Sequence, residues 1–161
     1  MGYRSDIRIV TSKAGFERLK EFVTKYLEEN KLDTKEYNLL DSIDVKAEGK
    51  GQVYFGWNYL KWYEGDYPEV DSIMEGINHL GENEYSYRYM RIGESYDDIE
   101  EQSYDGEKDN EIDLEYPNML REFDDNYVKQ LLKDKNIDNP EENKEEIDIW
   151  VFMMKYYQVL V

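Results

Sequence analysis

The residues best suited to chemistry in this sequence are the carboxylates that follow Gly93. Residues 94–125, named the acidic segment below, hold 14 acids and 2 bases, and the whole chain of 161 residues has a net charge of −18. A field of this sign repels nucleic acid and anionic membranes, and it attracts cations and basic proteins. Ten acids of this segment are the predicted partner-binding residues: Asp97, Asp98, Glu100, Glu101, Asp105, Glu107, Asp109, Glu111, Asp113 and Glu115.

Part of the acidic segment has the alternation of a strand, because Glu111, Asp113 and Glu115 alternate with apolar residues. In a strand this pattern places the three carboxylates on one face, roughly 6–7 Å apart. Each strand of duplex DNA carries a phosphate about every 3.4 Å, so the remaining acids could bring the charge density close to that of DNA. The segment is therefore interpreted as a surface that competes with nucleic acid for a basic groove. The alternative is a solvated acidic face that keeps the protein soluble.

A metal site in the same segment is a second alternative. The run from Asp105 to Glu111 supplies many oxygen ligands, which suit calcium or magnesium and could serve a metal-dependent hydrolase. The run has Gly106 at its second position, whereas the EF-hand loop has its glycine at the sixth, and no metal or other cofactor is predicted.

Catalytic residues have little support in this sequence. The chain has no Cys, and its single histidine, His79, lies near the predicted end of a helix, where a histidine more often interacts with the helix end than acts as a base. The sequence shows no nucleophile elbow, phosphate-binding glycine loop or HExxH motif. We therefore expect a binding protein and not an enzyme.

Aromatic residues alternate in two predicted strands, as in Phe55 and Trp57 and again in Tyr85, Tyr87 and Tyr89. RNA-binding domains use exposed sheet aromatics to stack bases, which is one interpretation of this pattern. Because few basic residues neighbour them, packing in the core or against a protein is the preferred interpretation.

The elements that must position these residues are predicted from apolar periodicity and turn residues. Alternation predicts strands at 5–11, 43–47, 53–63 and 85–92, and spacing of three and four predicts helices at 12–30 and 66–81. The order βαββαβ is typical of the ferredoxin-like α+β fold, an antiparallel sheet with two helices on one face. Two further strands, at 99–104 and 112–116, are expected to extend it as an acidic β-hairpin.

The chain after this domain, which is predicted to cover residues 1–125, is predicted to be a helical extension over 126–161. Its first helix is expected near Tyr127–Leu132, and its second begins at Asn139, with Pro140 at the first helical position. Residues 147–161 are apolar on nearly every side, so we expect this helix to pack on the domain or on a second copy.

Signals for export or membrane insertion are not predicted. The opening Met1–Asp6 leads directly into the first strand pattern without the apolar segment of a signal peptide. The longest apolar run, Ile149–Met154, is too short to cross a bilayer. Together with the absence of Cys, these features predict a cytoplasmic protein.

Three stretches resemble a family of small, uncharacterised bacteriophage and prophage proteins with an N-terminal GYRS(D/E) motif: Gly2–Ile7, Trp62–Val70 and Tyr87–Glu100. The resemblance implies a phage context and no catalytic residue. Small acidic phage proteins often inhibit host defence, as anti-CRISPR and anti-restriction proteins do, and several of them imitate nucleic acid by charge. This analogy between classes of protein predicts a phage-encoded, anti-CRISPR-like inhibitor in the host cytoplasm.

The expected partner of such an inhibitor is a basic protein or ribonucleoprotein of the host, bound at its nucleic-acid-binding surface, with no direct contact to nucleic acid or membrane. A homo-oligomeric phage assembly or scaffold protein without enzymatic activity is the alternative, and it depends on the apolar run at 147–161.

Overall fold

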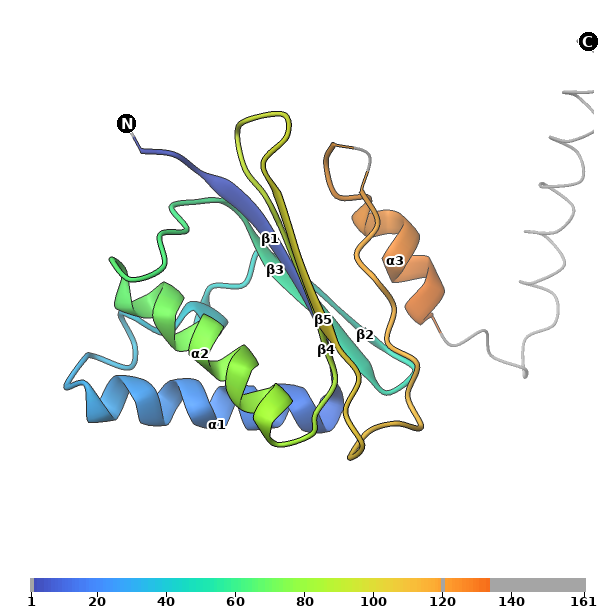
Figure 1. The fold of residues 1–161 in the computed structure, drawn as a ribbon, viewed down its shortest axis with the longest axis horizontal. Helices are drawn as coiled ribbons and strands as arrows, with labels where there is room; N and C mark the ends of the chain where they lie inside the picture. The colour runs from blue at the N-terminus through green and yellow to red at the C-terminus, as the bar shows by residue number, and fades with distance from the viewer. Residues whose placement is uncertain (1, 120, 134–161) are drawn as a thin grey trace, which may run out of the picture.

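The computed structural model describes residues 2–119 and 121–133, which form a mixed α+β fold. A five-stranded antiparallel sheet in the order β2-β3-β1-β4-β5 lies between α1 and α2 on one side and α3 on the other (Figure 1). In chain order the elements are β1 (Ser5–Ser12), α1 (Lys13–Glu29), the short 3-10 helix η1 (Leu39–Asp41), β2 (Val45–Gly49), β3 (Gln52–Leu60), α2 (Pro68–Glu82), β4 (Tyr87–Ile92), β5 (Ile99–Tyr104) and α3 (Asp125–Leu132).

The helices α1 and α2 form where their apolar stripes predict them. Ser12 caps α1 by accepting a hydrogen bond from the Gly15 amide at 3.0 Å, and Pro68 occupies the first turn of α2. The stripes of both helices bury their apolar side chains against one face of the sheet, with α1 contributing Phe16, Leu19, Val23 and Leu27 and α2 contributing Val70, Ile73, Ile77 and Leu80.

The central strand β1 is buried on both faces because its side chains alternate between two cores. Ile7 and Ile9 pack with α1 and α2, whereas Val10 points to the other side of the sheet. There it joins a second core with residues from β3, the acidic segment and α3, namely Tyr54, Leu114, Val128 and Leu132. The predicted α+β class is therefore confirmed, and layers cover both faces of the sheet instead of one.

The predicted acidic hairpin is wrong, although its first strand exists as β5. Residues 112–116 do not form a strand, and β5 pairs with β4 instead. The Gln52 side chain explains this difference, because its amide donates to the Asp113 carbonyl at 3.0 Å and accepts from the Glu115 amide at 2.8 Å. With Leu114 buried in the second core, residues 112–116 are held on the sheet face without joining the sheet.

The first predicted C-terminal helix is confirmed as α3, which spans the predicted boundary at residue 125 and packs on the sheet. Gly49 permits this packing, because a side chain there would overlap the backbone carbonyl of Leu132. The second helix, expected from Asn139 onward, lies outside the described residues. Of the helices within the described ranges, none is long and apolar enough to cross a bilayer.

Candidate partner-binding face

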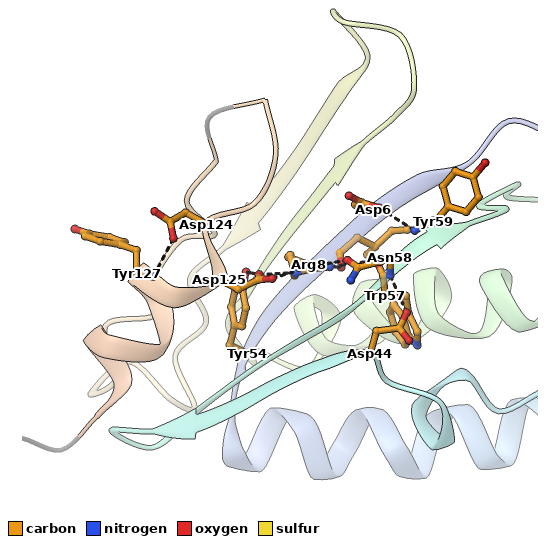
Figure 2. A network of polar contacts seen from close by, with 11 residues as sticks. Asp6, Arg8, Asp44, Tyr54, Trp57, Asn58, Tyr59, Asp124, Asp125 and Tyr127 are labelled. Atoms are coloured by element: carbon orange, nitrogen blue, oxygen red, sulfur yellow. Dashed lines mark hydrogen bonds and ion pairs between the residues drawn. The ribbon is translucent and has the colours of Figure 1, made fainter.

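A buried ion pair between Arg8 and Asp125 attaches α3 to the sheet (Figure 2). The Arg8 side chain is 2% exposed, and its Nε and Nη2 atoms donate to the two carboxylate oxygens at 2.8 and 3.1 Å. The Tyr54 hydroxyl donates to the same carboxylate at 2.6 Å. The guanidinium makes further hydrogen bonds to the carbonyls of Ile7 and Trp57 and to the side chain of Asn58.

The charge of Asp125 is stabilised by this network. Burial by itself would raise the pKa of Asp125, but the hydrogen bonds from Arg8 and Tyr54 and the positive charge of Arg8 lower it overall. Because the guanidinium and the carboxylate satisfy each other inside the protein, this pair positions α3 and is not available to a partner.

Three arginines of the sheet pair with aspartates of the acidic segment: Arg8–Asp125 and Arg91–Asp98 through two hydrogen bonds each, and Arg88–Asp105 through one hydrogen bond to an exposed carboxylate. The three cations lie on the adjacent strands β1 and β4, outside the acidic segment itself. Like charges crowded in one segment repel each other, and these pairs offset part of that repulsion. They hold the segment at three points along the sheet.

The turn between β4 and β5 is fixed by the Arg91–Asp98 pair and by the N-terminal segment. Arg91 donates to both oxygens of Asp98, at 2.7 and 3.0 Å, and the Tyr3 hydroxyl donates to one of them at 2.5 Å. The Tyr3 oxygen also accepts from the Ser95 amide at 2.9 Å. The hydrogen bonds from Arg91 and then from Tyr3 lower the pKa of Asp98 to about 2.

The lowered pKa of Asp98 predicts a loss of stability in acid. Because its folded pKa lies below its usual 3.8, the Asp98 carboxylate stabilises the fold above about pH 4 and ceases to do so as the pH falls toward 2. We expect the free energy of unfolding to fall by about 1 kcal/mol in this pH window. The loss is small because the Asp98 side chain is 31% exposed and solvent screens its ion pair. Urea unfolding of Asp98→Asn at pH 6, 4 and 2.5 should show a smaller decline with acid than the unsubstituted chain. An equal loss of stability in both proteins would show that the Asp98 carboxylate does not cause the sensitivity to acid.

Asp109 is a correction to the predicted partner-binding residues, because it is only 6% exposed. Its carboxylate accepts from the Ser12 hydroxyl at 2.7 Å, the Ser86 hydroxyl at 2.6 Å and the Ser86 amide at 3.0 Å. Ser86 Oγ in turn accepts from the Gly106 amide at 2.8 Å. Asp109 therefore anchors the loop after β5 to the sheet, where a partner cannot reach it.

The other predicted acids divide into two groups. Asp98 and Asp105 are bound by arginines, and Glu100 lies 3.6 Å from Arg91. Among the residues that the structure describes, the six others of these nine acids form no ion pair, and all six are exposed or half-buried: Asp97, Glu101, Glu107, Glu111, Asp113 and Glu115.

These six acids follow the length of the molecule instead of one strand face. Asp97 lies in the turn between β4 and β5, and Glu101 lies on β5. The other four belong to the stretch that follows β5: its residues 106–109 lie beside the end of α2 and the start of α1, and its residues 112–116 lie on the sheet face that α3 covers (Figure 1). The surface of β5 and of residues 105–116, called the acidic side below, therefore borders the ends of α1 and α2 at residues 106–109 and lies on the opposite face of the sheet at residues 112–116.

Exposed tyrosines accompany the acids. Tyr96 is 81% exposed and Tyr116 is 54% exposed, and the guanidinium groups of Arg121 and Arg88 lie over their rings at 5.5 and 4.4 Å. Stacking on a cation limits the freedom of each ring, and large, preordered aromatic side chains are common anchors in protein interfaces. By contrast, Phe55, Trp57 and Tyr89 are buried in the core beneath α1 and α2, so they do not form a surface for stacking RNA bases.

The single histidine, His79, contacts Arg18, Asn83 and Phe22. His79 borders a hollow of about 310 Å³ beside α1, its Nε2 accepts from Arg18 Nε at 3.2 Å, and its ring stacks on Phe22. Burial and the nearby charge of Arg18 lower the pKa of His79. Among residues 2–119 and 121–133, no group of three His, Asp or Glu side chains is arranged to hold a metal ion.

The sheet arginines are the structural residues that the sequence analysis missed. Arg8 follows Ile7 and precedes Ile9 and Val10, so it is a charge within a strand that is otherwise apolar. A charged residue in such a strand signals a buried partner, because an isolated buried charge is too costly. The identity of that partner is not encoded locally, since Asp125 is 117 residues away.

Protein-family models, curated proteins and solved structures were compared with this chain, and none of them matches it. The resemblance to phage proteins therefore stays a prediction, and the functional proposal depends on the geometry and charge of the acidic side.

Proposed function

We propose that this chain is a phage-encoded, anti-CRISPR-like inhibitor that acts in the host cytoplasm without enzymatic activity. It binds a basic, nucleic-acid-binding surface of a host defence complex through the acidic segment. One observation carries the proposal: among the described residues, six carboxylates without ion pairs lie on a segment that is itself anchored to the sheet. The resemblance of the sequence to phage proteins supplies the biological context.

Anchoring matters for binding because a charged surface that is already ordered loses little conformational entropy when a partner docks. The aspartates bound by sheet arginines and Asp109 fix the backbone of the acidic segment, and its remaining acids face solvent. A surface of this kind steers a basic partner toward it and fixes its orientation. The exposed rings of Tyr96 and Tyr116 supply apolar contact area on the same side.

We also propose that β1 to β4 with α1 and α2 form a ferredoxin-like unit to which β5 is added at one edge. Two features support this proposal: the element order βαββαβ and the antiparallel pairing of β1 with both β3 and β4. The fold carries no implication for function, because such folds host many unrelated activities.

Reversing charges on the acidic side is expected to abolish partner capture. The triple variant Glu111→Lys, Asp113→Lys and Glu115→Lys should capture at least about tenfold less partner from a lysate of the phage host, because each reversed charge turns attraction into repulsion. Capture by the unsubstituted chain should also weaken sharply between 0.1 and 0.5 M salt. Quantitative mass spectrometry of the captured proteins measures both effects.

The matched control for this experiment reverses three exposed acids of the helical layer with Glu21→Lys, Glu28→Lys and Glu75→Lys. The net charge changes equally in both triple variants, so a general charge effect would weaken both. Capture that is lost only in the acidic-segment variant supports the proposal. Capture that both variants retain, or that does not depend on salt, contradicts it.

A further inference from the structure

The strand β5 is an open edge of the sheet. In the part of the chain that the structure describes, β5 pairs only with β4, at the end of the order β2-β3-β1-β4-β5. The opposite edge differs, because α3 packs beside β2 and the carbonyl of Leu132 closely approaches Gly49. An edge strand presents a row of backbone N–H and C=O groups that can pair with another strand.

Side chains of β5 are largely exposed to solvent. Ile99 is 42% exposed although it is a large apolar residue, and Glu101, Gln102 and Ser103 are exposed as well. Protein chains commonly bind at such an edge by adding an extended segment, in which main-chain hydrogen bonds give affinity and alternate side chains give specificity.

The charges on β5 specify which kind of segment fits. Glu100 and Glu101 are consecutive, so their side chains point to opposite faces of the sheet. Glu101 forms no ion pair among the described residues, and Glu100 lies 3.6 Å from Arg91, which is bound more closely by Asp98 at 2.7 Å. A strand added beside β5 thus meets one carboxylate on each face of the sheet.

We propose that β5 accepts an extended segment of the partner as a sixth strand, with consecutive Lys or Arg residues opposite Glu100 and Glu101 and an apolar residue against Ile99. This inference rests on the proposed function, because it specifies how a basic partner is held at one edge of the acidic side. Each cross-strand pair of opposite charges stabilises an antiparallel pairing modestly. The backbone hydrogen bonds between β5 and the added strand stabilise it further.

A second copy of this chain is a poorer occupant of the same edge. Pairing two β5 strands would bring four glutamates together, in two chains that each have a net charge of −18. Like charges on adjacent strands are destabilising, so the charge of β5 selects a basic strand over its own copy.

The test uses a synthetic peptide as the probe, Thr-Val-Lys-Arg-Val-Thr with blocked ends, added to the full chain. Hydrogen exchange of the backbone amides should slow in residues 99–104 as peptide is added, and a titration followed by NMR chemical shifts gives the dissociation constant. The double variant Glu100→Gln and Glu101→Gln should weaken binding about fivefold. The same peptide with alternate amides N-methylated should bind at least about tenfold more weakly, because it cannot complete the ladder of hydrogen bonds.

A matched control is the double variant Glu21→Gln and Glu28→Gln, which removes the same charge from exposed positions of α1, outside the acidic segment, and should leave peptide binding unchanged. Equal binding of the N-methylated peptide, or protection outside 99–104, would overturn the strand-addition proposal. A doubled mass in solution, with β5 protected before peptide is added, would overturn it in favour of a second copy. If β5 fails these tests while the triple reversal at 111, 113 and 115 still abolishes host capture, the proposed function stands and only the sixth strand is rejected.

Discussion

Replacing Asp125 with alanine is expected to lower the free energy of unfolding by about 3 kcal/mol. The substitution leaves the Arg8 guanidinium buried at 2% exposure without the carboxylate that it binds through two hydrogen bonds. Because the Asp125 side chain is 24% exposed and water can enter the gap, we expect a loss at the lower end of the range for broken buried pairs. Urea unfolding followed by circular dichroism measures this loss.

Two further variants test whether the loss of stability in Asp125→Ala comes from the broken ion pair with Arg8. Asp124→Ala removes the neighbouring carboxylate, which caps α3 by accepting from the Tyr127 amide at 3.1 Å, and should cost about 1 kcal/mol. The double variant Arg8→Met and Asp125→Leu removes both charges and should recover most of the stability, because apolar residues of similar size often replace a buried ion pair without loss. If Asp125→Ala costs no more than Asp124→Ala, the ion pair does not stabilise α3 as described.

Replacing Asp109 with alanine should lower the free energy of unfolding by about 2 to 3 kcal/mol, because buried donors lose their acceptor. The carboxylate orients two hydroxyls: Ser12 Oγ, which caps α1, and Ser86 Oγ, which accepts from the Gly106 amide. Its removal therefore affects both the start of α1 and the loop after β5. Thermal unfolding of Asp109→Ala against Asp113→Ala, an exposed acid four residues away, measures the difference.

The Asp113→Ala control separates the loss of the buried hydrogen bonds of Asp109 from the loss of one negative charge. Asp113→Ala removes an equal charge but should change stability by less than about 0.5 kcal/mol. Hydrogen exchange in residues 105–111 and in the first turn of α1 should accelerate in Asp109→Ala while the strands β1 and β3 stay protected, since these two segments lose hydrogen bonds that Asp109 organises. Unchanged exchange in that loop would show that Asp109 does not hold it.

These anchors explain how so acidic a segment is ordered. Repulsion among its carboxylates is offset by arginines that the sheet supplies from beneath, and the acids that remain face solvent. Such anchors limit the conformational freedom of the segment's backbone, and a segment that is already ordered loses less entropy on docking than a flexible polyanion does.

Local patterns predicted much of the fold. The stripe of α1 residues from Phe16 to Leu27 and the proline that opens α2 depend only on neighbours within a few turns, so both helices were predictable. The same reasoning failed at 112–116, where the alternation of Asp113, Leu114 and Glu115 is that of a strand. There the Gln52 side chain supplies the hydrogen bonds that a neighbouring strand would have made.

The concentration of acids in the candidate site was predictable, but the environment of its individual residues was not. The excess of acids in residues 94–125 is visible in the composition, whereas the contacts of each acid are not. Asp109 has the same side chain as Asp113 and a similar sequence context, yet one is buried and the other exposed. Burial depends on what packs against a residue, and for Asp109 this is Ser12 and Ser86, which are distant in the chain.

By itself the sequence determined the α+β class, the helices α1 and α2, and the concentration of negative charge after Gly93, because periodicity and composition are properties of neighbouring residues. Only the tertiary structure decided which carboxylates are bound internally, which face solvent, and that β5 is the edge strand of the sheet among the described residues. The physical reason is that an ion pair or a strand edge depends on distances between segments far apart in the chain, as between Arg8 and Asp125, and these distances exist only once the sheet has formed.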